Sequence, residues 1–295
     1  MADRDDAGQM LAALGDGADL LVDCICYTAA DATRILPLVA NANSTVMIST
    51  KAVYVDRSGH HSNSAIAPRF DGPIRETQPT VAPKNNEDHT TREGYGPNKV
   101  AAEQVLLDCG HPVTVLRPSK VHGAWTRQPR EWVFVKRVLD RRPAILLAHR
   151  GAGVDHTTAA ANIAALIEAA AAAPGRRILN SADPDAPSAL EISRTIVTRL
   201  RHDWIEVLLD DQADPVLGRH PWDTQHPIVL DMTAAAGIGY TPVGDYAATV
   251  VDEIDWLVAS ARGGPGADAL PALDDPFFGP LLDYAAEDRY LESRR

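Results

Sequence analysis

The chain has 295 residues, of which 45% are hydrophobic and 23% charged, as in globular rather than disordered proteins. Its net charge of −12 disfavours sequence-independent binding to nucleic acid or anionic lipid. No stretch approaches the roughly 20 consecutive apolar residues of a membrane-spanning helix, so no membrane partner is expected. Three cysteines (Cys24, Cys26 and Cys109) suggest neither a disulfide framework nor a metal site, and no signal peptide follows Met1. A cytoplasmic location is therefore predicted.

Helical and extended patterns alternate in the first part of the chain. Helices are expected at residues 7–15, 30–40 and 95–107, and strands at 18–26, 46–49 and 113–116. The apolar run at 18–26 is typical of a buried parallel strand. Residues 56–93 are rich in turn-forming residues and predict a long loop. This order predicts an α/β fold with a Rossmann-like parallel sheet.

The second part of the chain has a different pattern. Helices are expected at 131–140, 158–173, 189–201 and 246–261, with a strand at 177–180. We therefore predict a partial Rossmann-like dinucleotide-binding domain over 1–120 and a mixed α/β, substrate-binding region with a C-terminal tail over 121–295. Residues 277–291 form either a docked helix or a frayed end.

The segment Tyr95-Gly96-Pro97-Asn98-Lys99 stands at the head of an expected helix. A spacing of four residues places the Tyr95 phenol and the Lys99 ammonium on one helix face. A nearby ammonium lowers the pKa of a tyrosine, which would make Tyr95 an acid or base usable near neutral pH. Taken alone, the same spacing also fits a solvated pair on a helix surface. Pro97 is expected in the first turn of this helix.

Two further motifs directly follow expected strands. Ser49 and Thr50 end the strand that leads to Tyr54, and Arg117-Pro118-Ser119-Lys120-Val121-His122-Gly123 follows the strand at 113–116. Open α/β sheets bind ligands at the carboxyl ends of their strands. Thr50 is therefore a candidate site residue, although a hydroxyl there can also simply cap the turn that follows.

The three motifs, in this order, resemble the extended short-chain dehydrogenase/reductase family, the NAD-dependent epimerase/dehydratase group, over roughly residues 3–180. The resemblance implies that Thr50, Tyr95 and Lys99 are catalytic. It also implies that Pro118 and Val121 line the nicotinamide and that Cys26 lies beside the cofactor's ribose and phosphates. Asp3 resembles an aspartate that contacts adenine.

By this resemblance the protein is an NAD- or NADP-dependent oxidoreductase, epimerase or dehydratase. It would act on a hydroxyl or carbonyl of a small substrate, such as a sugar nucleotide. Tyr95 would transfer the proton, Thr50 would position the reacting oxygen, and Lys99 would bind the nicotinamide ribose. A homodimer is also implied. The basic residues between Arg127 and Arg142 either meet substrate phosphates or form a solvated helix face.

The family's first strand and its GxxGxxG turn have no counterpart here. The sheet is therefore expected to be truncated on its N-terminal side. Either the given start lies too far along the chain, or the chain no longer binds dinucleotide in the usual way. The second case favours the alternative function, a non-catalytic binding or regulatory protein on the same scaffold. The histidines show no metal-ligand spacing, so no metal site is predicted.

Overall fold

The computed structural model describes residues 2–85, 88–272 and 274–294, which form two compact units. The first unit comprises the chain up to Ser119 together with Asn162–Ala182 and Leu230–Val243. The second comprises Lys120–Ala161, Asp183–Val229 and the chain from Gly244 onward. The chain first passes from the first unit to the second after Ser119, one residue before the boundary expected at 120/121. Because the chain returns to the first unit twice, neither unit is one continuous stretch.

The first unit is built on a four-stranded, entirely parallel sheet in the order β1-β2-β3-β7. Its strands are β1 (Ala18–Asp23), β2 (Ala42–Ile48), β3 (Val113–Pro118) and β7 (Arg177–Ser181). In register, Val46 of β2 pairs with Val22 of β1 and with Thr114 of β3. The predicted Rossmann-like α/β class is confirmed.

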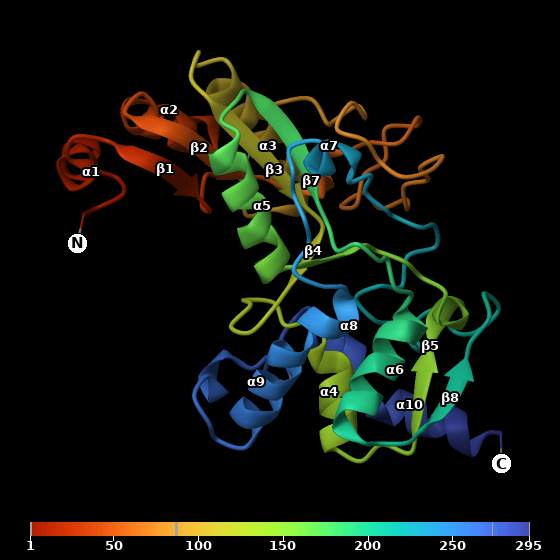
Figure 1. Cartoon of the computed structure of the whole chain (residues 1–295). Coiled ribbons are helices and arrows are strands. Elements are labelled where there is room, and N and C mark those ends of the chain that lie inside the picture. The colour runs from red at the N-terminus through yellow and green to blue at the C-terminus, as the bar shows by residue number, and fades with distance from the viewer. Residues whose placement is uncertain (1, 86–87, 273, 295) are drawn as a thin grey trace. The chain divides into compact units, whose positions relative to one another are not determined.

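Helices cover both faces of this sheet (Figure 1). They are α1 (Ala7–Leu14), α2 (Ala29–Val39), α3 (Arg92–Leu107), α5 (Ala160–Ala172) and α7 (Thr233–Ala236). Successive strand residues point to opposite faces. Met47 and Val115 accordingly pack with α2 and α3, while Val46 and Leu116 pack with α5 and α7.

Strand β1 forms one edge of the sheet, and β2 is its partner among the described strands. Its apolar sequence predicts a buried strand, but only Asp23 is buried within it and Val22 is 37% exposed. The strand also ends at Asp23 rather than continuing to Cys26. The prediction of a buried strand was therefore wrong, because β1 lies at the edge of the sheet that the described strands form.

The second unit contains two parallel strand pairs, β4 with β6 and β5 with β8. Its strands are β4 (Lys120–His122), β5 (Ala144–Leu147), β6 (Thr157–Ala159) and β8 (Ile205–Leu208). Its helices are α4 (Trp132–Leu139), α6 (Ala189–Leu200), α8 (Tyr246–Thr249), α9 (Val251–Ala261) and α10 (Tyr284–Glu292). Short 3-10 turns complete it at Ala148–Gly151, Ala267–Ala269 and Gly279–Leu282.

The core of the second unit is rich in aromatic side chains, including Trp132, Phe134 and Trp222. Near its C-terminus, α10 is a docked helix, because the buried Glu287 accepts a hydrogen bond from Arg137 of α4. The docked-helix interpretation of this segment is therefore the correct one. Within the described part of the chain, no helix is long and apolar enough to cross a membrane.

Candidate active site

The preceding backbone passes so close to the first turn of helix α3 that only a glycine fits at position 94. The Thr91 hydroxyl caps the helix by accepting a hydrogen bond from the Gly94 amide at 3.0 Å. A Cβ atom on Gly94 would lie 2.2 Å from the carbonyl oxygen of Asp88. The helix thus starts at Arg92, three residues before the predicted start, and Pro97 lies inside it rather than in its first turn. Because proline has no N–H, the helix lacks the backbone hydrogen bond from residue 97 to the carbonyl oxygen of Glu93, which is an exposed residue.

The face of α3 that carries Tyr95 and Lys99 is turned toward the carboxyl ends of β1 and β2. The Lys99 Nζ donates hydrogen bonds to the carbonyl oxygens of Cys26, at 2.9 Å, and Ile48, at 3.0 Å. It lies 6.0 Å from the centroid of the Tyr95 ring and 4.4 Å from that of Tyr27. Lys99 is only 2% exposed, so the pair is not a solvated helix pair.

Burial has an electrostatic consequence for Lys99. Removing the ammonium from water disfavours its charged form and lowers its pKa to about 8, although nearby acidic groups oppose this effect. A lysine of this kind is still largely charged at neutral pH. Its charge therefore acts in a low-dielectric site beside the Tyr95 ring.

Thr50 stands two residues beyond the end of β2. Its hydroxyl accepts a hydrogen bond from the Ala52 amide at 3.1 Å and so caps the short 3-10 turn Lys51–Val53. This turn packs against the start of α3, because a Cβ on Gly96 would lie 3.5 Å from the carbonyl oxygen of Ala52. Thr50, Tyr95 and Lys99 consequently lie on neighbouring elements. The capping role considered for Thr50 from sequence is present as well.

The sequence did not predict a buried ion pair that lies behind these residues. The Glu103 carboxylate, one helical turn after Lys99 on α3, accepts hydrogen bonds from Arg117 at 3.0 Å and 2.5 Å. The Ser49 hydroxyl donates to the same carboxylate. These contacts join α3 to the ends of β2 and β3, so they fix the face that presents Tyr95. No short spacing in the sequence points to this pair, because Glu103 and Arg117 lie on different elements.

Of the predicted cofactor-binding residues, Cys26 lies in this cluster. Its carbonyl accepts from Lys99, and burial raises the pKa of its thiol to about 12, so the thiol stays protonated. Pro118 is buried at the end of β3 and pairs with Ser181. Asp3 is exposed in the N-terminal turn, where its carboxylate accepts from the Asp5 amide. Val121 is on β4 of the second unit.

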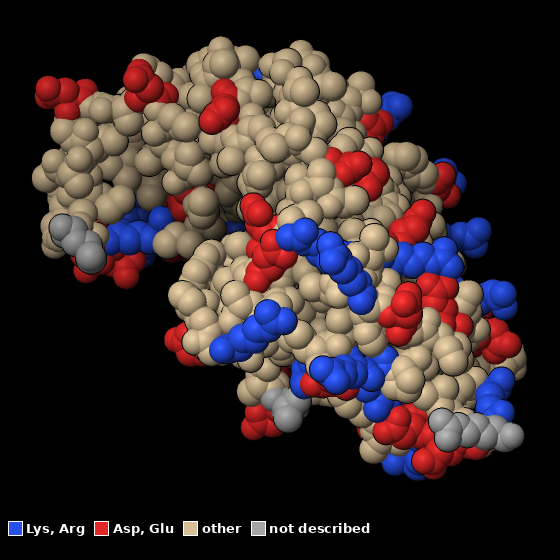
Figure 2. Space-filling view, turned by 60° about the horizontal axis from the view of Figure 1, so that its bottom comes forward, with Lys and Arg blue, Asp and Glu red and all other residues tan. Residues whose placement is uncertain are grey.

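The basic stretch of the second unit is largely neutralised by acidic neighbours. Lys136 lies 2.7 Å from Asp140, Arg142 lies 2.5 Å from Asp288, and Arg137 pairs with the buried Glu287. On the face drawn in Figure 2, blue and red side chains are interspersed. These three basic residues are therefore occupied by partners within the chain rather than grouped as a phosphate-binding patch.

Comparison with known proteins agrees with this architecture. Residues 30–159 match the NAD-binding family model described as male sterility protein. No curated protein matches the sequence significantly.

The fold is shared with solved enzyme structures of low sequence identity. One is the UDP-glucuronic acid 4-epimerase of Bacillus cereus, in complex with UDP-glucuronic acid and NAD. It is 15% identical in sequence, the TM-score is 0.56, and the match covers 78% of this chain and 67% of the epimerase chain. Another is a double mutant of the dTDP-glucose 4,6-dehydratase of Streptomyces venezuelae, with NAD bound: 18% identity, TM-score 0.60, 89% of this chain and 80% of that one. The dTDP-glucose 4,6-dehydratase of Bacillus anthracis, in complex with NAD, is 14% identical (TM-score 0.55, 79% and 68%). The family-model match over residues 30–159 and the shared fold agree with the resemblance to the extended short-chain dehydrogenase/reductase family.

Proposed function

From this shared fold we propose that the chain is an NAD(P)-dependent oxidoreductase, epimerase or dehydratase that acts on a hydroxyl or carbonyl group of a nucleotide sugar. The observation that carries the proposal is the buried Lys99 ammonium beside Tyr95, at the carboxyl ends of β1 and β2. This is where open α/β sheets bind ligands. The nucleotide sugars bound by the structural neighbours support the substrate class.

Tyr95 is the proton-transfer residue in this proposal. The adjacent positive charge of Lys99 stabilises the phenolate over the phenol, so the tyrosine can accept or return the proton of a substrate hydroxyl. Thr50 hydrogen-bonds the same substrate oxygen and orients it. The nicotinamide cofactor, when bound, supplies the hydride acceptor.

Lys99 also has the capacity to hold the cofactor's nicotinamide ribose. An ammonium group carries three N–H donors, and the carbonyls of Cys26 and Ile48 take two of them. The third donor is left for a ribose hydroxyl. The residues of this chain therefore fit the nicotinamide half, with Pro118 and Val121 as further expected contacts. Asp3 stays a prediction for adenine.

A second candidate function is a non-catalytic binding or regulatory protein. It is favoured by one observation, that the sequence has no GxxGxxG turn to hold the cofactor's pyrophosphate. The burial of Lys99 argues against it, because a buried charge is costly to maintain without a role for it.

Replacing Tyr95 by phenylalanine separates the two functions. The whole chain is incubated with NAD or NADP and a panel of UDP- and dTDP-sugars, and the sugar products are analysed. We expect turnover by the wild-type chain and a loss of roughly 100-fold or more in Tyr95→Phe, because only the hydroxyl that moves the proton is removed. Circular dichroism checks that the variant is folded.

The matched control is Tyr290→Phe, which removes a phenol hydroxyl from α10 in the second unit. Its turnover should equal that of the wild type. Undiminished turnover in Tyr95→Phe would refute the assignment of the proton-transfer residue. The absence of turnover by the wild-type chain with every sugar would favour the non-catalytic function.

A further inference from the structure

Three buried side chains of the second unit gather at a place that the proposed reaction does not use. His122 ends β4, Glu131 precedes α4, and Glu253 lies in α9. Their exposed fractions are 1%, 1% and 0%. One ligand atom from each residue lies within 4.8 Å of the others, the one group of three such residues found in the described ranges. Their sequence separations gave no metal-binding pattern, so the sequence predicted no metal site.

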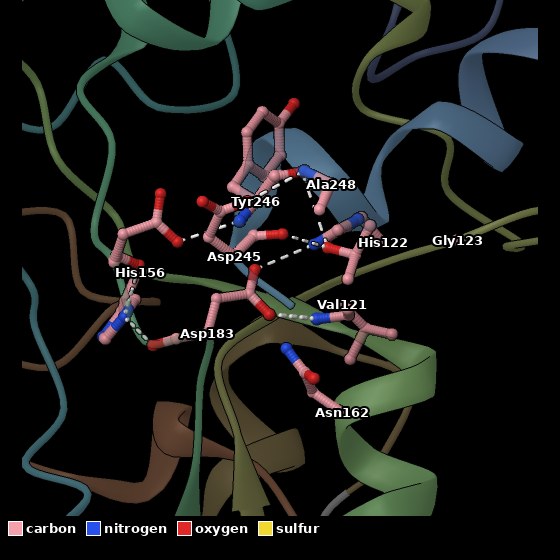
Figure 3. Close-up of polar contacts among 12 residues, drawn as sticks. Val121, His122, Gly123, His156, Asn162, Asp183, Asp245, Tyr246 and Ala248 are labelled. Carbon is pink, nitrogen blue, oxygen red and sulfur yellow. Dashed lines mark hydrogen bonds and ion pairs between the residues drawn. The ribbon is translucent and has the colours of Figure 1, made fainter. Parts of the chain in front are cut away.

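The histidine is oriented from behind by a carboxylate. Figure 3 shows His122 next to Asp183, with its Nε2 2.9 Å from Asp183 Oδ2. The other oxygen of this carboxylate, Asp183 Oδ1, accepts a hydrogen bond from the Ala159 amide at 2.7 Å, so Asp183 acts as an acceptor here. With Asp183 as the acceptor, Nε2 carries the hydrogen. The other ring nitrogen, Nδ1, therefore presents a lone pair.

That lone pair has no hydrogen-bond partner although it is buried, and the same is true of Glu253 Oε1. The other Glu253 oxygen accepts from the Gly123 amide at 2.5 Å, and Glu131 accepts from the Tyr246 hydroxyl at 3.2 Å. The unfilled positions of the cluster are thus acceptors. Leaving buried acceptors unpaired is costly, and a cation satisfies several of them at once.

A proton shared by the two glutamates is the simpler way to relieve this cost. The ligand atoms of Glu131 and Glu253 lie within 4.8 Å of each other and both side chains are buried, so one proton could lie between the two carboxylates. Such a proton satisfies the carboxylates, but the His122 Nδ1 lone pair would still have no partner. A proton shared by the two carboxylates therefore leaves the His122 Nδ1 atom without an interaction partner, whereas a cation supplies one.

We propose that His122 Nδ1 and the carboxylates of Glu131 and Glu253 bind one divalent transition-metal cation of the zinc type. One imidazole and two carboxylates suit such an ion, whereas magnesium and calcium prefer oxygen ligands alone. Asp183 is the positioning residue, in the carboxylate–histidine–metal arrangement that fixes the tautomer and orientation of a ligating ring. The bound ion joins β4, α4 and α9, so its role is to stabilise the second unit.

Zinc binding by the whole chain tests this proposal without reference to catalysis. Chelator-treated protein is dialysed against zinc chloride, bound metal is measured by elemental analysis, and thermal unfolding is followed with and without zinc. We expect one zinc ion per chain, a higher Tm with zinc, and a loss of affinity greater than roughly 100-fold in Glu253→Gln. Millimolar magnesium should not displace the ion.

Two variants guard against misfolding and surface binding. Asp183→Asn leaves all three ligands in place and should weaken binding by about 10- to 100-fold. His149→Ala is the matched control, because it removes an exposed histidine 2.9 Å from Asp211, in the same unit, and should leave binding unchanged. The proposal is overturned if the wild-type chain takes up no zinc, as the shared-proton arrangement requires. It is equally overturned if Glu253→Gln and Asp183→Asn bind like the wild type, or if His149→Ala alone abolishes binding.

Discussion

His220 is a buried histidine in the second unit, 3% exposed, with its ring 6.3 Å from that of Phe134. Burial disfavours the charged imidazolium and lowers its pKa to about 4. The unfolded chain has the ordinary, higher pKa and takes up a proton first as the pH falls. The stability associated with the neutral ring is therefore complete above about pH 6.5 and is lost as the pH falls toward 4.

We predict that the free energy of unfolding falls by up to about 3 kcal/mol more in the wild type than in His220→Asn between pH 6.5 and pH 4. Urea denaturation at a series of pH values gives the free energy of unfolding of each protein, and hence the slope of that free energy against pH. The difference between them removes the contribution of carboxylates common to both proteins. Equal slopes would mean that His220 is not held neutral by burial.

At the same scale, the sequence predicted some site residues and missed others for a clear reason. Tyr95 and Lys99 were found because their relation is local, one helical turn, and the structure places the lysine beside the ring. Glu103 and Arg117 meet only because α3 packs beside β3, and that contact is not encoded in any short spacing. The His122, Glu131 and Glu253 cluster joins three separate elements and was equally out of reach.

At the scale of elements, the start of α3 depends on the absence of a side chain at Gly94. A Cβ there would lie 2.2 Å from the carbonyl oxygen of Asp88, which no rotamer change can relieve. We predict that Gly94→Ala lowers the free energy of unfolding by about 1–3 kcal/mol, because the backbone must shift. Chemical denaturation measures this loss.

Gly72→Ala is the matched control, since a Cβ at Gly72 would meet nothing within 4 Å and Gly72 has no positive φ. Its stability should stay within about 0.5 kcal/mol of the wild type. If both substitutions have the same small effect, the close approach at Gly94 does not constrain the helix.

The elements that sequence predicted well are those with long, regular patterns. The four strands of the main sheet and the helices α2, α3 and α6 lie near their predicted positions, because apolar runs or periodic apolar residues mark them in the sequence. Strands β4, β5, β6 and β8 were missed, since three or four residues are too short for a periodicity. Their partners are also distant in sequence: Lys120 pairs with Thr157, and Ala144 with Ile205.

At the scale of the whole molecule, the chain divides its fold between two units by crossing between them repeatedly. The boundary after Ser119 falls within the motif Arg117–Gly123, one residue before the boundary expected from sequence. The return of Asn162–Ala182 was not, because β7 joins the sheet by pairing with β3, and a strand pattern does not name its neighbour. The α/β class could thus be predicted, and Thr50, Tyr95 and Lys99 stay a predicted site, whereas the division into units needed the tertiary structure.

The most direct test of the proposed cofactor site is a calorimetric titration of the whole chain with NADH and NADPH. It is made on the wild type, Tyr95→Phe and Lys99→Met. We predict binding of at least one cofactor by the wild type, nearly the same Kd for Tyr95→Phe, and a Kd raised roughly 10-fold or more for Lys99→Met, because a charged hydrogen bond to the ribose is lost. The proposed cofactor site would be contradicted if the folded wild-type chain bound neither cofactor. It would also be contradicted if the Lys99→Met variant bound as tightly as the wild type.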